Sequence, residues 1–128
     1  MVKKVVNWFE INNKISWLIT ILLALFIFYM SSRTFPPGIP GISIGSYVYH
    51  FGIYFVFGFF LFISITKGKL DKKYLVFIAI LAAIGYGISD EIHQFFVPSR
   101  YCCYEDVLTD AIGILSSGIV YTGINFKK

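Results

Sequence analysis

The sequence predicts an all-α protein, a bundle of four transmembrane helices with both termini in the cytoplasm. Of its 128 residues, 57% are hydrophobic and 14% are charged, whereas a soluble domain carries about 25% charged residues. Four apolar stretches are each close to the roughly 20 residues that cross a bilayer as a helix. All nine lysines fall on one side of the four-span arrangement that these stretches define. The same composition excludes a disordered chain, and two cysteines are too few for a disulfide scaffold.

The four expected spans are residues 15–32, 47–66, 74–97 and 107–124. The first contains no charged residue, and the second contains no histidine or charged residue except His50. The third is apolar as far as Ile88 and then reads SDEIHQFFV, and the fourth is apolar except for Asp110. These runs are too long for strands and lack the alternation of a membrane β-barrel. Because the connections are short, residues 1–128 are expected to form a single membrane domain.

The basic residues predict the orientation. The side that holds the nine lysines carries a net charge of +7, and the opposite side, with two arginines and five acids, carries −3. Lysine-rich connections stay in the cytoplasm, so the lysine-bearing side is expected to face inward in a multi-pass plasma-membrane protein. Since the lysines are assigned to topology, no nucleic-acid partner is expected.

Ionisable residues are expected just inside the outer boundary of the membrane. The run from Tyr74 to Ile88 covers only about 22 Å as a helix, whereas the hydrocarbon core is roughly 30 Å thick. The helix should therefore continue through about Gln94, which places three further ionisable residues at this depth: Asp90, Glu91 and His93. His50 and Asp110 lie about one turn from the outer ends of their own spans.

Helical spacing indicates that these side chains face the interior of the bundle. Asp90 shares a face with the residues at i−4, i+3 and i+4, whereas Glu91 lies about 100° around the helix from Asp90. On the last span, Gly113 and Ser117 follow Asp110 on one stripe and should permit close helix approach. Lipid offers an ionisable group no partner, which favours a polar cleft open to the outside. The alternative is that the ionisable side chains pair with one another, for example Arg100 with an acid, and only stabilise the bundle.

The third span and the turn after it carry the most specific motif, YGISDEIHQFFVPSR from Tyr86 to Arg100. This run resembles the VanZ-like family, whose members read S-D-E-x-x-Q-x-F-x-P-G-R and then an acidic residue, an Asn and a Gly on the last span. Further matching positions are Ser31, Ser32, His50, Phe51, Tyr54, Asp106 and Gly113. The resemblance implies an integral membrane protein of the teicoplanin-resistance type. Most members have no resistance role, so resistance is not assigned to this chain.

Two positions depart from the family pattern. Ser99 replaces the glycine before Arg100, which puts the shape of that turn in question. Asp110 stands where the family has Asn, and it either adds a negative charge beside Asp106 or holds a proton and acts like the amide.

The polar residues suggest an enzyme that acts on a lipid head group or a lipid-linked phosphate. Arginine grips phosphate through its guanidinium fork, and histidine held by a carboxylate serves as general base, acid or nucleophile. The candidate catalytic residues are His50, Asp90, Glu91, His93, Arg100 and Asp106. The candidate substrate-binding residues are Ser32, Arg33, Tyr54, Gln94 and Asp110.

A divalent cation is a further hypothesis, with Asp106 and Asp110 as its ligands at i and i+4. Oxygen ligands suit magnesium or calcium, whereas the two histidines leave zinc open. The alternative function is a non-catalytic envelope protein that binds membrane lipids or an antibiotic through the same cleft. Ion transport is disfavoured because the inner halves of the spans are apolar. The oligomeric state is left open.

Aromatic residues and loops receive simpler interpretations. Tyrosines and tryptophans near the span ends, Tyr121 among them, are expected in interfacial belts, and the phenylalanines are expected to face lipid. The segment VVNWFEI before the first span is a candidate interfacial helix. Cys102 and Cys103 are expected as free outer thiols, and the proline-rich loop after the first span is expected to cover the cleft.

Overall fold

The computed structural model describes residues 1–34, 44–100 and 104–126. These residues form five helices: α1 (Val2–Ile11), α2 (Asn13–Ser31), α3 (Ile44–Thr66), α4 (Lys73–Phe95) and α5 (Tyr104–Phe126). No strand occurs in the described part of the chain. Helices α2 to α5 are each long and apolar enough to cross a membrane. The predicted all-α architecture with four membrane-spanning helices is therefore confirmed.

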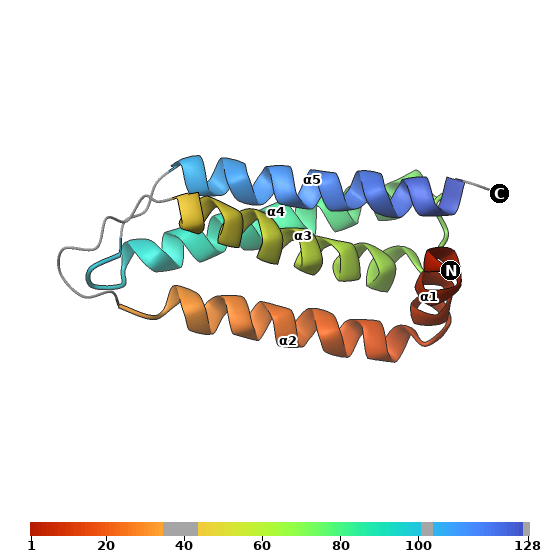
Figure 1. Cartoon of the computed structure of the whole chain (residues 1–128), viewed down its shortest axis with the longest axis horizontal. Coiled ribbons are helices and arrows are strands. Elements are labelled where there is room, and N and C mark those ends of the chain that lie inside the picture. Colours follow the sequence, from red (N-terminus) through yellow and green to blue (C-terminus); the bar gives the residue numbers. More distant parts are fainter. Residues whose placement is uncertain (35–43, 101–103, 127–128) are drawn as a thin grey trace.

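The four long helices lie side by side and alternate in direction, and α1 lies across one end of the bundle (Figure 1). We call this end, with α1, the 67–72 turn and the last turn of α5, the lysine end. The opposite end, where α2 and α4 finish and α3 and α5 begin, is called the acidic end. The proline-rich loop and the two cysteines lie outside the described residues, so the expectations for them stay predictions.

The ends of α4 and α5 differ from the expected spans for local chemical reasons. α4 ends at Phe95, two residues earlier than expected, because Pro98 disfavours helical backbone just before it. α5 begins three residues earlier than expected, and Glu105 and Asp106 lie in its first turn, where carboxylates interact favourably with the helix dipole. In the turn between them Ser99 has φ +65°, the left-handed conformation that a glycine adopts without strain.

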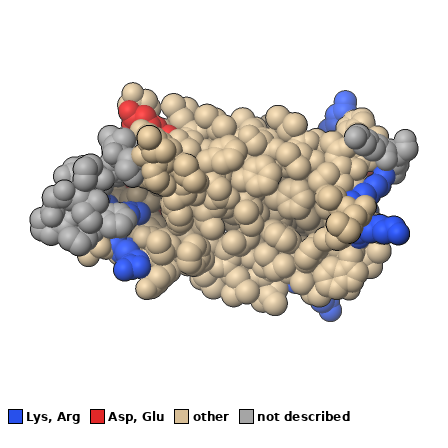
Figure 2. Space-filling view, viewed as in Figure 1, with Lys and Arg blue, Asp and Glu red and all other residues tan. Residues whose placement is uncertain are grey.

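The outer surface of the bundle is apolar. Figure 2 shows charged side chains at the two ends of the molecule and, on this face, a band without them in between. Large hydrophobic side chains are exposed along all four long helices, as expected of surface that contacts lipid. Three aromatic residues contradict their expected placement, since Phe57, Phe62 and Tyr121 are at most 3% exposed and belong to the core. All three are buried because they lie on helix faces turned toward neighbouring helices.

The closest helix packing joins α3 to α5, and it depends on glycine. A Cβ atom at Gly113 of α5 would lie 2.6 Å from the carbonyl oxygen of Phe51 on α3. A Cβ atom at Gly58 of α3 would lie 2.6 Å from Oγ of Ser117 on α5. The Phe51 oxygen is backbone and leaves no room for a side chain at Gly113, whereas the Ser117 hydroxyl at Gly58 can rotate away. The expected close approach below the acids is therefore present, and it fixes the relative heights of α3 and α5.

A polar network holds α1 and the 67–72 turn against the lysine end. The hydroxyl of Tyr121 donates a hydrogen bond to Oε1 of Glu10 (2.7 Å) and accepts one from the backbone N–H of Gly68 (3.1 Å). Asn125 donates to the same carboxylate oxygen (3.0 Å), and Thr66 lies 2.9 Å from the Tyr121 hydroxyl. These contacts join α1, α3, α5 and the turn, so the helix expected before the first span exists and is an integral part of the fold.

Candidate functional site

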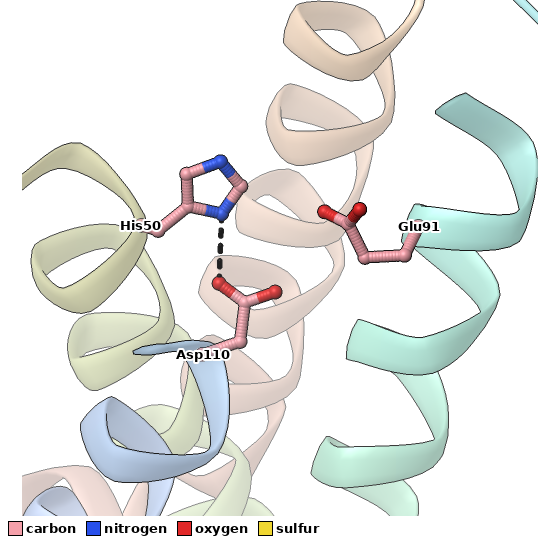
Figure 3. Close-up of side chains that lie close together, drawn as sticks. All are labelled: His50, Glu91 and Asp110. Carbon is pink, nitrogen blue, oxygen red and sulfur yellow. Dashed lines mark hydrogen bonds and ion pairs between the residues drawn. The ribbon is translucent and has the colours of Figure 1, made fainter. Parts of the chain in front are cut away.

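The centre of the acidic end is a hydrogen-bonded pair of His50 and Asp110. Nδ1 of His50 on α3 lies 2.8 Å from Oδ1 of Asp110 on α5 (Figure 3). Each is the seventh residue of its helix, and the close packing at Gly113 brings the two helices to matching height. Both side chains are buried, with 5% of His50 and 1% of Asp110 exposed. A carboxylate on one imidazole nitrogen fixes the ring and directs its second nitrogen toward whatever it serves.

Asp106 lies beside that second nitrogen. Its Oδ2 atom is 3.8 Å from Nε2 of His50, at the distance of a long ion pair when the imidazole is protonated. Asp106 precedes Asp110 by one helical turn, so the imidazole of His50 is placed between two carboxylates of α5. Such an imidazole can accept a proton at Nε2 and is stabilised by both acids once it carries the charge.

Glu91 extends from α4 toward the same pair (Figure 3). Only 2% of this residue is exposed, and neither carboxylate oxygen has a hydrogen-bond partner among the described residues. Oδ2 of Asp110 likewise has no partner within the described ranges. One potential ligand atom from each of His50, Glu91 and Asp110 lies within 4.8 Å of the other two. Buried carboxyl groups are normally hydrogen-bonded, so this arrangement calls for a further partner.

Asp90 belongs to an adjoining polar group. Its Oδ2 accepts hydrogen bonds from the hydroxyl of Tyr54 (3.1 Å) and from the side-chain amide of Gln94 (3.2 Å). The rings of Tyr54 and His50 lie parallel, with centroids 6.5 Å apart, so this group borders the histidine pair. Asp90 and Glu91 are adjacent in sequence and both buried, yet Asp90 is hydrogen-bonded to this adjoining group whereas Glu91 is directed toward the His50–Asp110 pair, as the 100° offset between them predicts.

His93 lies apart from this cluster. Its Nε2 is 2.9 Å from Oγ of Ser32, and its ring stacks on Phe28 with centroids 4.7 Å apart. Both contacts are with α2 and the residue that follows it, so His93 joins α2 to α4 and is not part of the group around His50. Ser31, the last residue of α2, is 2% exposed, and its hydroxyl has no hydrogen-bond partner within the part of the chain that the structure describes.

The two arginines both lie at the acidic end, where the chain leaves a helix. Arg33 follows α2 and is exposed, whereas Arg100 follows α4 and is half-buried. Figure 2 shows basic side chains at this end as well as at the lysine end. A guanidinium beyond the helix ends is suitably placed for an anion that approaches along the membrane surface.

The predicted site residues therefore form distinct groups. His50, Glu91, Asp106 and Asp110 form the inner group, which we call the His50 cluster. Tyr54, Asp90 and Gln94 border it, whereas Ser32 and His93 form a separate pair. Sequence reasoning did not single out Phe28, the aromatic partner of His93. Phe28 precedes Ser32 by four residues, so the two lie on one helix face, and this spacing could have identified Phe28 as a neighbour of the site.

Comparison with known protein families identifies the family of the chain. A sequence model of the VanZ/LLP1 family matches residues 5–125, nearly the whole chain, including all four long helices and most of α1. No curated protein and no solved structure matches the chain. The match agrees with the resemblance of the segment that holds Asp90, Glu91 and Gln94. This four-helix membrane protein belongs to the VanZ/LLP1 family.

Proposed function

We propose that this VanZ-family protein binds or chemically modifies a phosphate-bearing lipid, or a lipid-linked envelope precursor, at the outer face of the plasma membrane. The observation that carries the proposal is the buried pair of His50 and Asp110 with a second carboxylate at Nε2. A histidine oriented in this way is equipped for general acid–base chemistry. Packing of apolar helices in a membrane does not require a buried histidine between two carboxylates.

The depth and surroundings of the cluster support a head-group substrate. His50 and Asp110 each lie six residues beyond the first residue of their helix, about 9 Å along its axis. A phosphate held at the helix ends by Arg33 and Arg100 would place its ester bonds between the arginines and the histidine. Phosphoryl transfer needs mainly positioning and charge neutralisation, and these residue types supply both.

The charge distribution predicts how the protein is oriented in the membrane. Seven of the nine lysines lie at the lysine end among the described residues, the other two follow α5 in the sequence, and connections rich in lysine remain in the cytoplasm. The acidic end then faces outward, where lipid-linked envelope precursors are displayed. The proposed active cleft is therefore expected on the outer side of the membrane.

Burial of the cluster supports a second candidate function, a non-catalytic lipid-binding or accessory protein of the envelope. His50, Glu91 and Asp110 are at most 5% exposed, so a substrate reaches them only if neighbouring segments move. A protein that only binds a lipid at its acidic end needs no such access.

Mass spectrometry of lipids distinguishes the two functions. The purified full-length protein, in bilayer nanodiscs, is incubated with anionic phospholipids or isoprenoid phosphates, and head groups are followed with time. Lipid turnover by wild type that is abolished in His50→Gln and in Asp110→Ala supports the enzyme. Asp71→Ala in the exposed 67–72 turn is the matched control. A retained lipid of unchanged mass supports the binding protein. Wild-type protein that neither alters nor retains any of these lipids contradicts both.

A further inference from the structure

We propose that His50, Glu91 and Asp110 form a binding site for one divalent transition-metal ion of the zinc type. The three residues come from α3, α4 and α5, and one potential ligand atom of each lies within 4.8 Å of the others (Figure 3). This set differs from the pair predicted from sequence, because it keeps Asp110 but takes Glu91 and His50 in place of Asp106. The inference goes beyond the proposed function, since a metal site here requires no particular lipid.

The unpartnered oxygens are the second observation that points to a cation. Both oxygens of Glu91 and Oδ2 of Asp110 are buried, and none has a hydrogen-bond donor among the described residues. Figure 3 shows the Glu91 carboxylate directed toward the His50–Asp110 pair. Buried carboxylates require a compensating partner, and a metal ion between the three side chains supplies one.

Charge and ligand type select the class of ion. Two carboxylates and a neutral imidazole carry a total charge of −2, which a divalent ion neutralises within an apolar bundle. Imidazole nitrogen is a preferred ligand of zinc and its transition-metal neighbours, whereas magnesium and calcium take oxygen ligands almost alone. Three protein ligands leave a fourth position open, as in catalytic zinc sites.

The geometry needs only small adjustments to accept the ion. Metal–ligand bonds of about 2.0–2.2 Å at tetrahedral angles place ligand atoms roughly 3.3 Å apart. The 2.8 Å contact between Nδ1 of His50 and Oδ1 of Asp110 must therefore widen slightly, or Oδ2 must turn inward, while Glu91 moves closer. If the ion binds at Nδ1, the proton shared with Asp110 is released to solvent, so binding is accompanied by proton release.

Metal analysis of the full-length protein tests the site. Protein purified through a tag without histidine is stripped with chelator, titrated with Zn²⁺, Mn²⁺, Mg²⁺ or Ca²⁺, and assayed for bound metal and for heat of binding. The Cys102→Ser/Cys103→Ser background removes the thiols, which bind zinc on their own. We expect one Zn²⁺ per chain, and an affinity at least about 10-fold lower in His50→Gln, Glu91→Gln and Asp110→Asn. Glu105→Gln, in the first turn of α5, should bind as the parent does.

Thermal unfolding provides a second measurement that does not depend on activity. A ligand that binds only the folded state raises the midpoint, and an ion that joins three helices should do so strongly. We expect Zn²⁺ to raise the midpoint of thermal unfolding of the parent and of Glu105→Gln but not that of Glu91→Gln. Measurement of the helix content of Glu91→Gln checks that this variant is folded. Absence of stoichiometric zinc, equal affinity in all variants, or preference for Mg²⁺ or Ca²⁺ over Zn²⁺ would overturn the assignment.

Discussion

At the scale of single residues, the acidic end combines satisfied and unsatisfied polar groups. Asp90 accepts two hydrogen bonds, and Asp110 holds His50 through one oxygen. Glu91, equally buried, has no hydrogen-bond partner among the described side chains and backbone groups. A bundle that used its acids only as internal locks would pair them all, because an unpaired buried polar group costs about 1–3 kcal/mol. The unsatisfied residue therefore adds to the support that the His50–Asp110 pair gives to a functional site.

Ser99 gives a prediction about backbone conformation. Its φ of +65° lies in the left-handed region, which costs a side-chain-bearing residue about 1 kcal/mol relative to glycine. We expect Ser99→Gly to stabilise the protein by up to about 1 kcal/mol, measured by thermal or denaturant unfolding in detergent. The matched control is Ser89→Gly at an exposed position inside α4, where the same substitution should destabilise by about 0.5 kcal/mol. Equal destabilisation by the two substitutions would contradict the strained turn.

At the scale of helices, the contact between α3 and α5 sets the geometry of the site. Both helices present glycine where their backbones meet, and His50 and Asp110 lie on the acidic-end side of that contact. A shift of one helix along the other would separate Nδ1 from Oδ1. Packing of small residues thus positions the hydrogen-bonded pair.

Gly113→Ala tests this dependence. The added methyl would lie 2.6 Å from the Phe51 carbonyl oxygen, a backbone atom that cannot move alone, so we expect destabilisation by about 1–3 kcal/mol. Gly123→Ala on the same helix meets no atom within 4 Å and should be neutral or stabilising, because alanine favours helix. Similar unfolding midpoints for the two variants would show that α3 and α5 do not depend on this contact.

The network at the lysine end predicts a different response. Tyr121→Phe keeps the buried ring but removes the hydroxyl that contacts Glu10, Thr66 and the Gly68 N–H. We expect a loss of about 1–3 kcal/mol and faster hydrogen exchange in α1 and the 67–72 turn. Tyr74→Phe, at an exposed position of α4, is the control and should change neither. Unchanged exchange in α1 of Tyr121→Phe would mean that the network does not hold this helix.

At the scale of the whole molecule, the charge distribution predicts orientation. Cys102 and Cys103 lie in the connection between α4 and α5, so they belong to the acidic end by chain order. With the lysine end in the cytoplasm, a membrane-impermeant maleimide should label these thiols on intact cells. A cysteine introduced at Lys69, in the turn at the lysine end, should react only after permeabilisation in a Cys102→Ser/Cys103→Ser background. The reverse pattern would invert the proposed topology.

The sequence predicts the helices well because hydropathy and span length are properties of single segments. Membrane-spanning helices and their order follow from local pattern. The partners of individual side chains do not, because they depend on how helices rotate against one another. His93 and His50 looked equivalent in sequence, yet one faces α2 and the other α5. The position of Tyr121 near a span end predicts an interfacial residue, whereas its burial depends on contacts with Glu10 and Phe62 from other helices.

Glu91→Gln tests whether the buried acid at position 91 has a function or only stabilises the helix bundle. Gln has nearly the shape of Glu, removes the buried charge and can donate a hydrogen bond to the unpartnered Oδ2 of Asp110. Unfolding free energy should be measured after chelator treatment, so that no bound metal contributes, and lipid retention or turnover on untreated nanodiscs of wild type and variant. We expect Glu91→Gln to be as stable as wild type, or about 1 kcal/mol more stable, and to lose lipid retention or turnover. A variant that is less stable but handles lipid as wild type does would contradict a functional His50 cluster.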